Sequence, residues 1–187
     1  VVLLINGLPL VVIELKNATD ENADIKAAYN QLQTYKKLIS SLFTYNALMI
    51  VSDGWFARVG TISSDYSRFM EWKTADGVTI VNTQRESELV PMILGLLNKK
   101  TLLDVIRHFI VFEETKEKTL KKVAAYHQYY AVNKAIDKTI MATTSHEEDK
   151  KGRAGVVWHT QGSGKSLSMV FYAGKLVLEE HMNNPTL

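Results

Sequence analysis

The fold is decided near the start of the chain by residues 1–16, VVLLINGLPLVVIELK. Two apolar runs flank the dipeptide Asn6-Gly7, which is the strongest short signal for a tight turn between antiparallel strands. The stretch therefore predicts a β-hairpin. At the end of the second run, apolar and polar residues alternate, so we expect that end to emerge from the core. Glu14 and Lys16 are two positions apart, and they point to the same face of a strand.

The residues that follow predict a mixed α/β core. Apolar side chains recur at three- and four-residue spacing over residues 21–43, which is the pattern of an amphipathic helix. Two further strands are expected over residues 47–51 and 56–62, on either side of a turn at 52–54. The predicted order is therefore strand, strand, helix, strand, strand.

The second half of the chain is predicted to be mainly helical up to a glycine-bearing loop. An irregular, aromatic segment over residues 65–76 separates it from the first half. The expected elements are short helices over 86–97 and 101–109 with a bend or a later start at Pro91, a longer helix over 119–139, a solvated loop over 143–153, a strand over 155–158, a loop over 159–164 and a helix over 165–181.

Composition excludes several classes of protein. The 187 residues include no cysteine, which rules out disulfide scaffolds, thiolate metal sites and cysteine nucleophiles. No apolar run reaches the roughly 18 residues that cross a bilayer, so we expect no membrane association and a cytoplasmic location. The net charge of +2 allows nucleic-acid binding only through a local basic surface. Because the chain opens on Val1 inside an apolar run, we expect it to be part of a longer protein.

The strongest single motif is Gln161-Gly162-Ser163-Gly164-Lys165-Ser166. Glycines let the backbone fold closely around a phosphate, so that amides and a helix N-terminus face the anion. In this pattern Lys165 neutralises the β- and γ-phosphates of ATP, and the Ser166 hydroxyl binds Mg²⁺. The alternative interpretation is a plain glycine-rich turn with a surface lysine.

One position departs from the full phosphate-loop pattern. His159 stands where the pattern has its first glycine. The relaxed form is typical of superfamily 2 helicases and translocases rather than of kinases or small GTPases. The acidic Mg²⁺ ligand that such a site also needs is expected beyond Leu187, so these residues provide half of an ATP site.

Glu14 and Lys16 form an E-x-K motif that has little specificity by itself, since the same spacing recurs three times in the chain. Only this copy ends a buried strand of a hairpin. There the carboxylate can bind Mg²⁺, while the lysine orients an attacking water and stabilises charge on a scissile phosphate. The alternative is a solvated ion pair at a strand end.

A nuclease site of this kind needs a second metal-binding carboxylate on the neighbouring strand. Residues 1–5 contain none, so we expect an acidic residue immediately before Val1. Gln31 and Tyr35 are four apart on the predicted helix and lie near one another on one flank. They either place polar groups beside Glu14 and Lys16 or belong to the helix surface and the edge of the core.

The order of the motifs resembles that of the restriction (R) subunit of type I restriction-modification enzymes. The resemblance extends over nearly the whole chain. The residues that carry it are Glu14-Leu15-Lys16 after the apolar run, Gln31-x-x-x-Tyr35, Val51-Ser52-Asp53-Gly54 with Ala57-Arg58-Val59-Gly60, Arg68-Phe69-Met70-Glu71-Trp72-Lys73-Thr74 before Asp76-Gly77, Tyr126-His127-Gln128-Tyr129-Tyr130-Ala131-Val132, and His159-Thr160 before the phosphate loop.

This resemblance implies a fold and a division of the chain. Residues 1–110 would be the later part of a PD-(D/E)xK nuclease domain, which is a mixed-sheet core. Residues 111–187 would be a junction and the start of the first of two RecA-like motor domains that translocate duplex DNA.

The resemblance also implies roles, cofactors and partners. Glu14 and Lys16 match the E-x-K pair of the family, Gln31 and Tyr35 match its Q-x-x-x-Y motif, and Gln128 is similar to the glutamine that reads adenine. The implied cofactors are Mg²⁺ and ATP. The implied partners are double-stranded DNA and the methyltransferase and specificity subunits of the same complex.

Two functions follow as hypotheses, with a third left open. The first is an ATP-dependent endonuclease subunit that translocates DNA and then cleaves it. The second is a superfamily 2 motor whose degenerate nuclease-like domain only binds DNA or other subunits, as expected if the residue before Val1 is not acidic. The third is a different fusion of a nuclease with a helicase.

Overall fold

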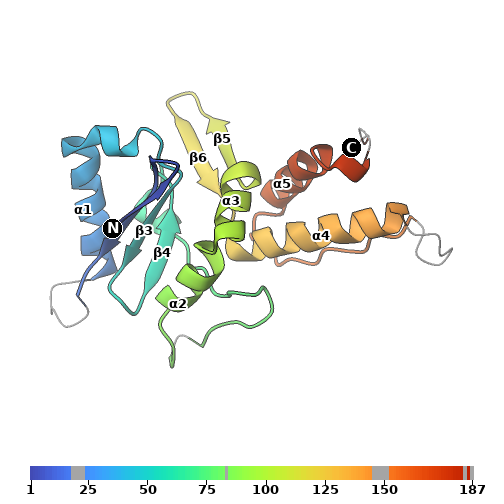
Figure 1. The fold of residues 1–187 in the computed structure, drawn as a ribbon, viewed down its shortest axis with the longest axis horizontal. Coiled ribbons are helices and arrows are strands. Elements are labelled where there is room, and N and C mark those ends of the chain that lie inside the picture. The colour runs from blue at the N-terminus through green and yellow to red at the C-terminus, as the bar shows by residue number, and fades with distance from the viewer. Residues whose placement is uncertain (18–23, 83, 145–151, 183–184, 186–187) are drawn as a thin grey trace.

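The computed structural model describes the chain apart from residues 18–23, 83, 145–151, 183–184 and 186–187 (Figure 1). A four-stranded sheet with helix α1 on one side forms one end of the molecule. Helices α4 and α5 form the other end, with α3 between them and the sheet. No described helix is both long and apolar enough to cross a bilayer.

The opening stretch forms the predicted hairpin. Strands β1 (Val2–Ile5) and β2 (Leu8–Leu15) pair antiparallel, with Val2 opposite Val12. Asn6 and Gly7 have φ angles of 51° and 81°. Two consecutive positive φ angles define the tight turn whose twist matches that of the flanking strands, which explains why Asn-Gly stands there.

The hairpin is one side of a mixed sheet, which confirms the predicted strand order. Helix α1 (Ile25–Leu38) connects β2 to β3 (Leu48–Ser52), and β4 (Ala57–Gly60) completes the sheet in the order β1-β2-β3-β4. Strands β2 and β3 are parallel, whereas the other two pairs are antiparallel. Short 3₁₀ turns lie at Ser40–Phe43 and Tyr66–Arg68.

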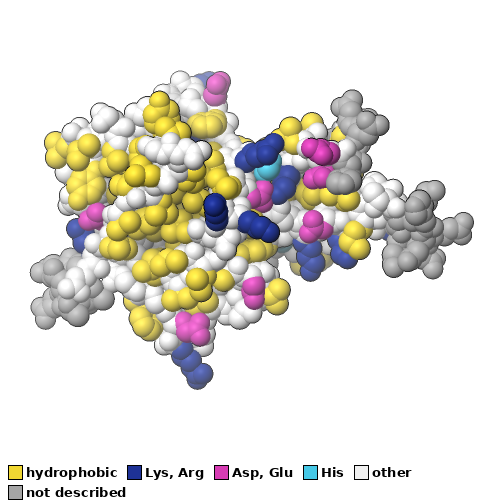
Figure 2. Space-filling view, in the orientation of Figure 1, with side chains coloured by type: hydrophobic (Ala, Val, Ile, Leu, Met, Phe, Trp, Pro, Cys, Tyr) yellow, Lys and Arg dark blue, Asp and Glu magenta, His cyan; other side chains and the backbone are white. Residues whose placement is uncertain are grey.

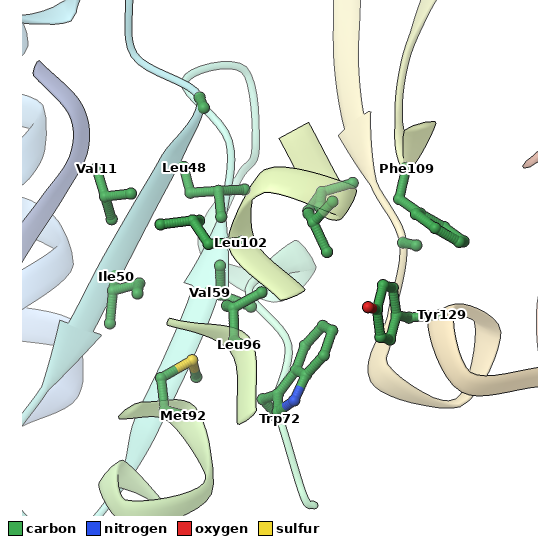
Figure 3. Close-up of a cluster of buried hydrophobic side chains, with 14 of the residues drawn as sticks. Val11, Leu48, Ile50, Val59, Trp72, Met92, Leu96, Leu102, Phe109 and Tyr129 are labelled. Carbon is green, nitrogen blue, oxygen red and sulfur yellow. The ribbon is translucent and has the colours of Figure 1, made fainter. Parts of the chain in front are cut away.

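Alternate residues of the strands fill two separate apolar clusters. The smaller cluster lies under α1 and contains Val12, Met49 and Val51 of the strands with Ala28 and Leu32 of the helix. The larger cluster covers the opposite face and continues to the far end of the molecule. Figure 3 follows it through Val11, Leu48, Ile50, Val59, Trp72, Met92, Leu96, Leu102, Phe109 and Tyr129.

Of the two short helices predicted over residues 86–109, the first is shorter than predicted, whereas the second begins two residues earlier and ends one residue earlier. Helix α2 covers Leu89–Pro91 and continues as a π-helical turn over Met92–Leu96, and α3 covers Lys99–His108. Pro91 therefore lies in the first turn, where its missing N–H has no intrahelical partner to lose. The helix does start later than residue 86, but at Leu89 rather than at Pro91.

The prediction of a helix over 119–139 is wrong for its first residues. Strands β5 (Ile110–Glu114) and β6 (Thr119–Val123) form an antiparallel ribbon, and α4 covers Tyr126–Thr144. The ribbon is fixed to the sheet by the side chains of Thr61 and Ser63, which donate hydrogen bonds to the Lys121 carbonyl at 2.6 and 3.0 Å. These partners lie far away in the sequence, so local helical spacing does not reveal them.

The predicted strand over 155–158 is also wrong. These residues have no ladder partner among the described strands, and Trp158 is 89% exposed. A strand forms only where a neighbour supplies its backbone hydrogen bonds. The predicted helix that follows is confirmed as α5 (Lys165–Val177), with a 3₁₀ turn at Glu180–Met182. Most of the predicted loop over 143–153 lies outside the described residues.

Two glycines predict opposite effects of the same substitution. A Cβ on Gly95 would lie 2.5 Å from the backbone oxygen of Thr74 and 2.7 Å from Nε1 of Trp72, whereas a Cβ on Gly174 meets nothing within 4 Å. We expect Gly95→Ala to lower the free energy of unfolding by about 1–3 kcal/mol through overpacking. Gly174→Ala, inside α5, is expected to raise it by about 0.5–1 kcal/mol. Urea unfolding of the two variants measures both, and equal effects would contradict the packing around Trp72.

Candidate functional site

The C-terminal end of β2 carries Glu14 and Lys16 on one face. Their carboxylate and ammonium groups form an ion pair, with 3.1 Å between Oε1 and Nζ. Glu14 lies opposite Val51 of β3, whose side chain packs in the cluster under α1. The side chain of Glu14 is 14% exposed and that of Lys16 is 27% exposed. The pair is therefore half-sheltered beside α1 but open to solvent at the strand end.

Helix α1 packs on the face of the sheet that carries this pair. Tyr35 contacts the small apolar cluster, and Gln31 is half-buried one residue before Leu32, which is fully buried there. Among the hydrogen bonds of the described residues, none joins Gln31 or Tyr35 to Glu14 or Lys16. The structure thus brings the two predicted motifs to one side of the sheet but shows no direct contact between them.

The described residues do not by themselves form a site for a metal ion. Glu14 offers the hard oxygen ligand that Mg²⁺ prefers. No group of three or more His, Asp or Glu side chains that could hold a metal is present among the described residues. The predicted role of Glu14 as a Mg²⁺ ligand therefore stays a prediction.

The predicted phosphate loop leads directly into α5. Gly162 and Gly164 have φ angles of 80° and 79°, which favour glycine because a Cβ is strained in the left-handed region. Lys165 reaches back over the loop, and its Nζ donates to the carbonyl oxygens of His159 at 3.1 Å and Thr160 at 3.0 Å. Ser166 is exposed in the first turn of the helix. The lysine and the serine therefore stand where the motif predicts them, at the N-terminal end of α5.

Gln128, at the start of α4, supports this loop from behind. Its Nε2 donates to the Gly164 carbonyl at 3.0 Å, and its Oε1 accepts the Ala125 backbone N–H at 2.9 Å. The side chain is buried, with Gln128 4% exposed. A Cβ on Gly164 would lie 2.7 Å from Nε2, so a larger residue there would displace the Gln128 amide as well as strain the left-handed backbone. The predicted adenine-reading role of Gln128 stays a prediction, because here its amide bonds to protein backbone.

Sequence reasoning noted His159 only as a departure from the loop pattern, and it assigned neither His159 nor His127 a role at the loop. The Nε2 atom of His127 lies 3.2 Å from the Ser163 carbonyl oxygen, and the rings of His127 and His159 are 5.5 Å apart. Burial, with the nearby His127 and Lys165, lowers the pKa of His159. The available signal was position, since one histidine precedes Gln128 and the other replaces the first loop glycine.

A groove of about 650 Å³ runs beside the loop between α4, residues 154–159 and α5. Lys165, Ser168 and Tyr172 line it from α5, and Lys138 lines it from α4. It is large enough for a nucleotide-sized ligand.

Comparisons with known proteins match both parts of this arrangement. Residues 1–68 match the family model described as type I restriction enzyme R protein N terminus, and residues 127–187 match the SWI2/SNF2 ATPase model. The chain is 51% identical over 185 residues to the type I restriction enzyme HindI endonuclease subunit of Haemophilus influenzae, covering 98% of the chain and 17% of that relative.

Two more distant relatives have similar names. The putative type I restriction enzyme MjaIXP endonuclease subunit of Methanocaldococcus jannaschii is 33% identical over 201 residues, with 100% of the chain and 19% of the relative covered. The type I restriction enzyme SsaAORF53P endonuclease subunit of Staphylococcus saprophyticus is 31% identical, with 96% and 18% covered. The chain thus spans less than a fifth of the length of each of these relatives.

The contacts of Gln128 predict the effect of removing its amide. We expect Gln128→Leu, which keeps most of the volume, to leave the buried Ala125 N–H unpaired at a cost of about 1–3 kcal/mol. The loop over 159–164 loses its support at the same time. Hydrogen exchange of the Ala125 and Gly164 region should therefore speed up, whereas the exposed control Gln84→Leu should leave it unchanged. Unchanged exchange in Gln128→Leu would show that the amide does not hold the loop.

Proposed function

The chain belongs to the endonuclease (R) subunits of type I restriction enzymes, and on this premise we propose that it joins a Mg²⁺-dependent DNA-cleaving site to the ATP-binding loop of a duplex-DNA motor. One observation carries the proposal. Glu14 and Lys16 share a sheet face 3.1 Å apart, in the same chain that presents Lys165 and Ser166 at the N-terminus of α5. A carboxylate–lysine pair serves phosphodiester cleavage, and a glycine-bearing loop before a helix serves nucleotide binding.

In the nuclease site each side chain has a separate task. Glu14 would hold Mg²⁺, which when bound lowers the pKa of water and stabilises negative charge. When the metal binds, the ion pair between Lys16 and Glu14 would break. Lys16 would then orient the attacking water and stabilise the charge on the phosphate. Gln31 and Tyr35 would place polar groups at this end of the sheet from α1. The proposed fold of this part, residues 1–110, is that of the PD-(D/E)xK nucleases.

The hairpin register supports a second carboxylate opposite Glu14. Val1 and Ile13 exchange both backbone hydrogen bonds, at 2.7 and 2.8 Å. A residue that precedes Val1 in the same strand would therefore stand directly across from Glu14 on the same face, with Cα atoms about 4.5 Å apart. We propose that this position is acidic, so that two carboxylates flank one metal.

The phosphate loop would bind ATP through its backbone and its lysine. Lys165 would exchange the carbonyl oxygens of His159 and Thr160 for phosphate oxygens, and Ser166 would bind the Mg²⁺ of the nucleotide. Gln161, Gly162 and Ser163 would present the loop amides. The remaining part, residues 111–187, would be a junction and the start of a RecA-like domain, with Gln128 beside the base.

The proposed partners are double-stranded DNA and the methyltransferase and specificity subunits of a cytoplasmic complex. The second candidate function, a motor with a non-cleaving nuclease-like domain, is favoured by one observation. Among the described residues no group of three or more His, Asp or Glu side chains could hold a metal, and the Glu14 carboxylate is paired with Lys16.

Substitutions in the full-length subunit, assembled with its partners, separate the two sites. We expect Glu14→Gln and Lys16→Met to lower DNA cutting at least about a hundredfold while ATP hydrolysis stays within about twofold, because charge stabilisation at the phosphate is lost. Lys165→Ala should remove both activities. The control is Glu113→Gln, which breaks the exposed pair of Glu113 with Lys122 on the β5–β6 ribbon. Full cutting by Glu14→Gln would contradict the nuclease assignment.

Metal binding tests the proposed second carboxylate. In the longer protein we expect calorimetry with Mn²⁺ to show a site that is lost in Glu14→Gln and equally lost when the residue before Val1 is replaced by its amide, because both remove an oxygen ligand. A non-acidic residue at that position, or Mn²⁺ binding that survives both changes, would favour the non-cleaving alternative.

A further inference from the structure

Helix α5, which begins at the phosphate loop, is held by side chains at two places. At its start, Gln128 of α4 donates to the Gly164 carbonyl. Further along, Lys175 is held by groups from α3 and α4. Lys175 follows Lys165 by about 15 Å along the helix axis. Because α5 is one continuous helix from Lys165 to Val177, a displacement of the loop at its start also displaces Lys175.

Lys175 is the centre of a closed triad. Its Nζ lies 2.7 and 2.8 Å from the two carboxylate oxygens of Asp104 on α3, and 2.6 Å from Oδ1 of Asn133 on α4. Asn133 Nδ2 donates in turn to Asp104 Oδ2 at 3.2 Å. All three donors of the ammonium are thus used, and each member of the triad comes from a different helix.

The triad is sheltered, and further groups reinforce it. The side chains of Lys175 and Asp104 are 16% and 20% exposed. The Lys175 ammonium lies 5.3 Å from the centre of the Phe109 ring. His108 Nδ1 is 2.7 Å from Asp104 Oδ1. Burial raises the pKa of the Asp104 carboxyl, but hydrogen bonds from Lys175 and His108 hold this pKa below its usual value. A network that is fully hydrogen-bonded in this way has one preferred geometry.

Asp104 belongs to the sheet side of the molecule. On the same helix, Leu102 and Val105 are buried in the large apolar cluster, together with Val11, Ile13 and Ile50 of the sheet. Figure 3 shows Leu102 between the strands and the Phe109–Tyr129 pair. In Figure 2 the strand side of the visible face is mostly apolar, and charged side chains gather on the side of the helices. The triad therefore joins a helix anchored on the nuclease-like sheet to the helix that starts at the phosphate loop.

We propose that Asp104, Asn133 and Lys175 form the link through which the position of the phosphate-loop helix is passed to the nuclease-like sheet. This inference rests on the proposed function and extends it. The three side chains are positioning residues, since they bond to one another and none of them belongs to the Glu14–Lys16 pair or to the phosphate loop. Breaking the triad leaves each site intact and removes the polar link between α3 and α5, so that only their shared apolar cluster still couples the two helices. ATP is then still hydrolysed, while fewer hydrolysis events lead to a cut.

The test measures DNA cuts per ATP hydrolysed by the full-length subunit in its complex, on a plasmid that the wild-type complex cuts. The variants are Asp104→Asn, Lys175→Met, the two combined, and Lys175→Arg, which keeps the charge. Lys122→Met is the matched control, because it removes a lysine from an exposed ion pair with Glu113. The KM for ATP and the melting temperature of each complex are measured in parallel.

We expect Asp104→Asn and Lys175→Met to lower the ratio of cuts to ATP about tenfold, with the KM for ATP within about twofold. The double variant should lower this ratio no further than the more affected single variant does, because both substitutions break the same link. Lys175→Arg should keep most of the ratio, and Lys122→Met all of it. An unchanged ratio, or ATP hydrolysis that falls in proportion to cutting, would overturn the link and assign the triad to stability alone.

Two further results keep the test decisive. If the Asp104 and Lys175 variants do not fold, Asn133→Ala removes one contact to the ammonium and leaves the ion pair, and a partial fall in the ratio supports the link whereas no fall overturns it. If the wild-type complex hydrolyses ATP but cuts no DNA, it is the proposed function that fails.

Discussion

The parallel pairing of β2 with β3 is the constraint on which the rest of the structure depends. Parallel neighbours cannot be joined by a tight turn, so the chain must cross the sheet, and α1 is that crossing. The same pairing brings the C-terminal ends of both strands to one edge. Glu14 and Lys16 stand at this edge, on the face that α1 covers. The candidate nuclease site thus follows from strand direction as much as from the side chains themselves.

The phosphate loop depends on a different kind of support. Among the described strands, residues 155–158 have no partner. The loop is instead held by Gln128, which donates to the Gly164 carbonyl, and by Lys165, which donates to the His159 carbonyl. Both contacts use hydrogen-bonding groups that a bound nucleotide would compete for. The turn of the loop therefore depends on side chains of α4 and α5 rather than on a neighbouring strand.

The parts of the fold that were predictable from sequence are those fixed by local rules. The Asn6-Gly7 turn and the periodic apolar residues of α1 and α5 specify their structure within one turn or one helix. The β5–β6 ribbon was missed because residues 119–123 become a strand only through partners in 110–114 and at Thr61. Strand formation depends on neighbours that periodicity does not show.

For the candidate sites too, local sequence patterns place some residues, whereas other contacts depend on the folded chain. A period of two was enough to place Glu14 and Lys16 on one face, and the glycine pattern was enough to place Lys165 at a helix start. The contact of Gln128 with the loop, and the meeting of Asp104 with Lys175, join residues about 36 and 71 positions apart. Such contacts are set by how the helices pack, and only the folded chain reveals them.

One apolar cluster runs without interruption from Val11 in the sheet to Leu176 near the end of α5. The first and second parts of the chain pack closely in this cluster, because Trp72 and Phe109 of the first part both contact Tyr129 of the second. A chimera that took the nuclease-like half from one relative and the loop-bearing half from another would bring together two surfaces that never co-evolved. Successful recombination between such genes is therefore expected to exchange this whole block of chain, with crossovers outside it.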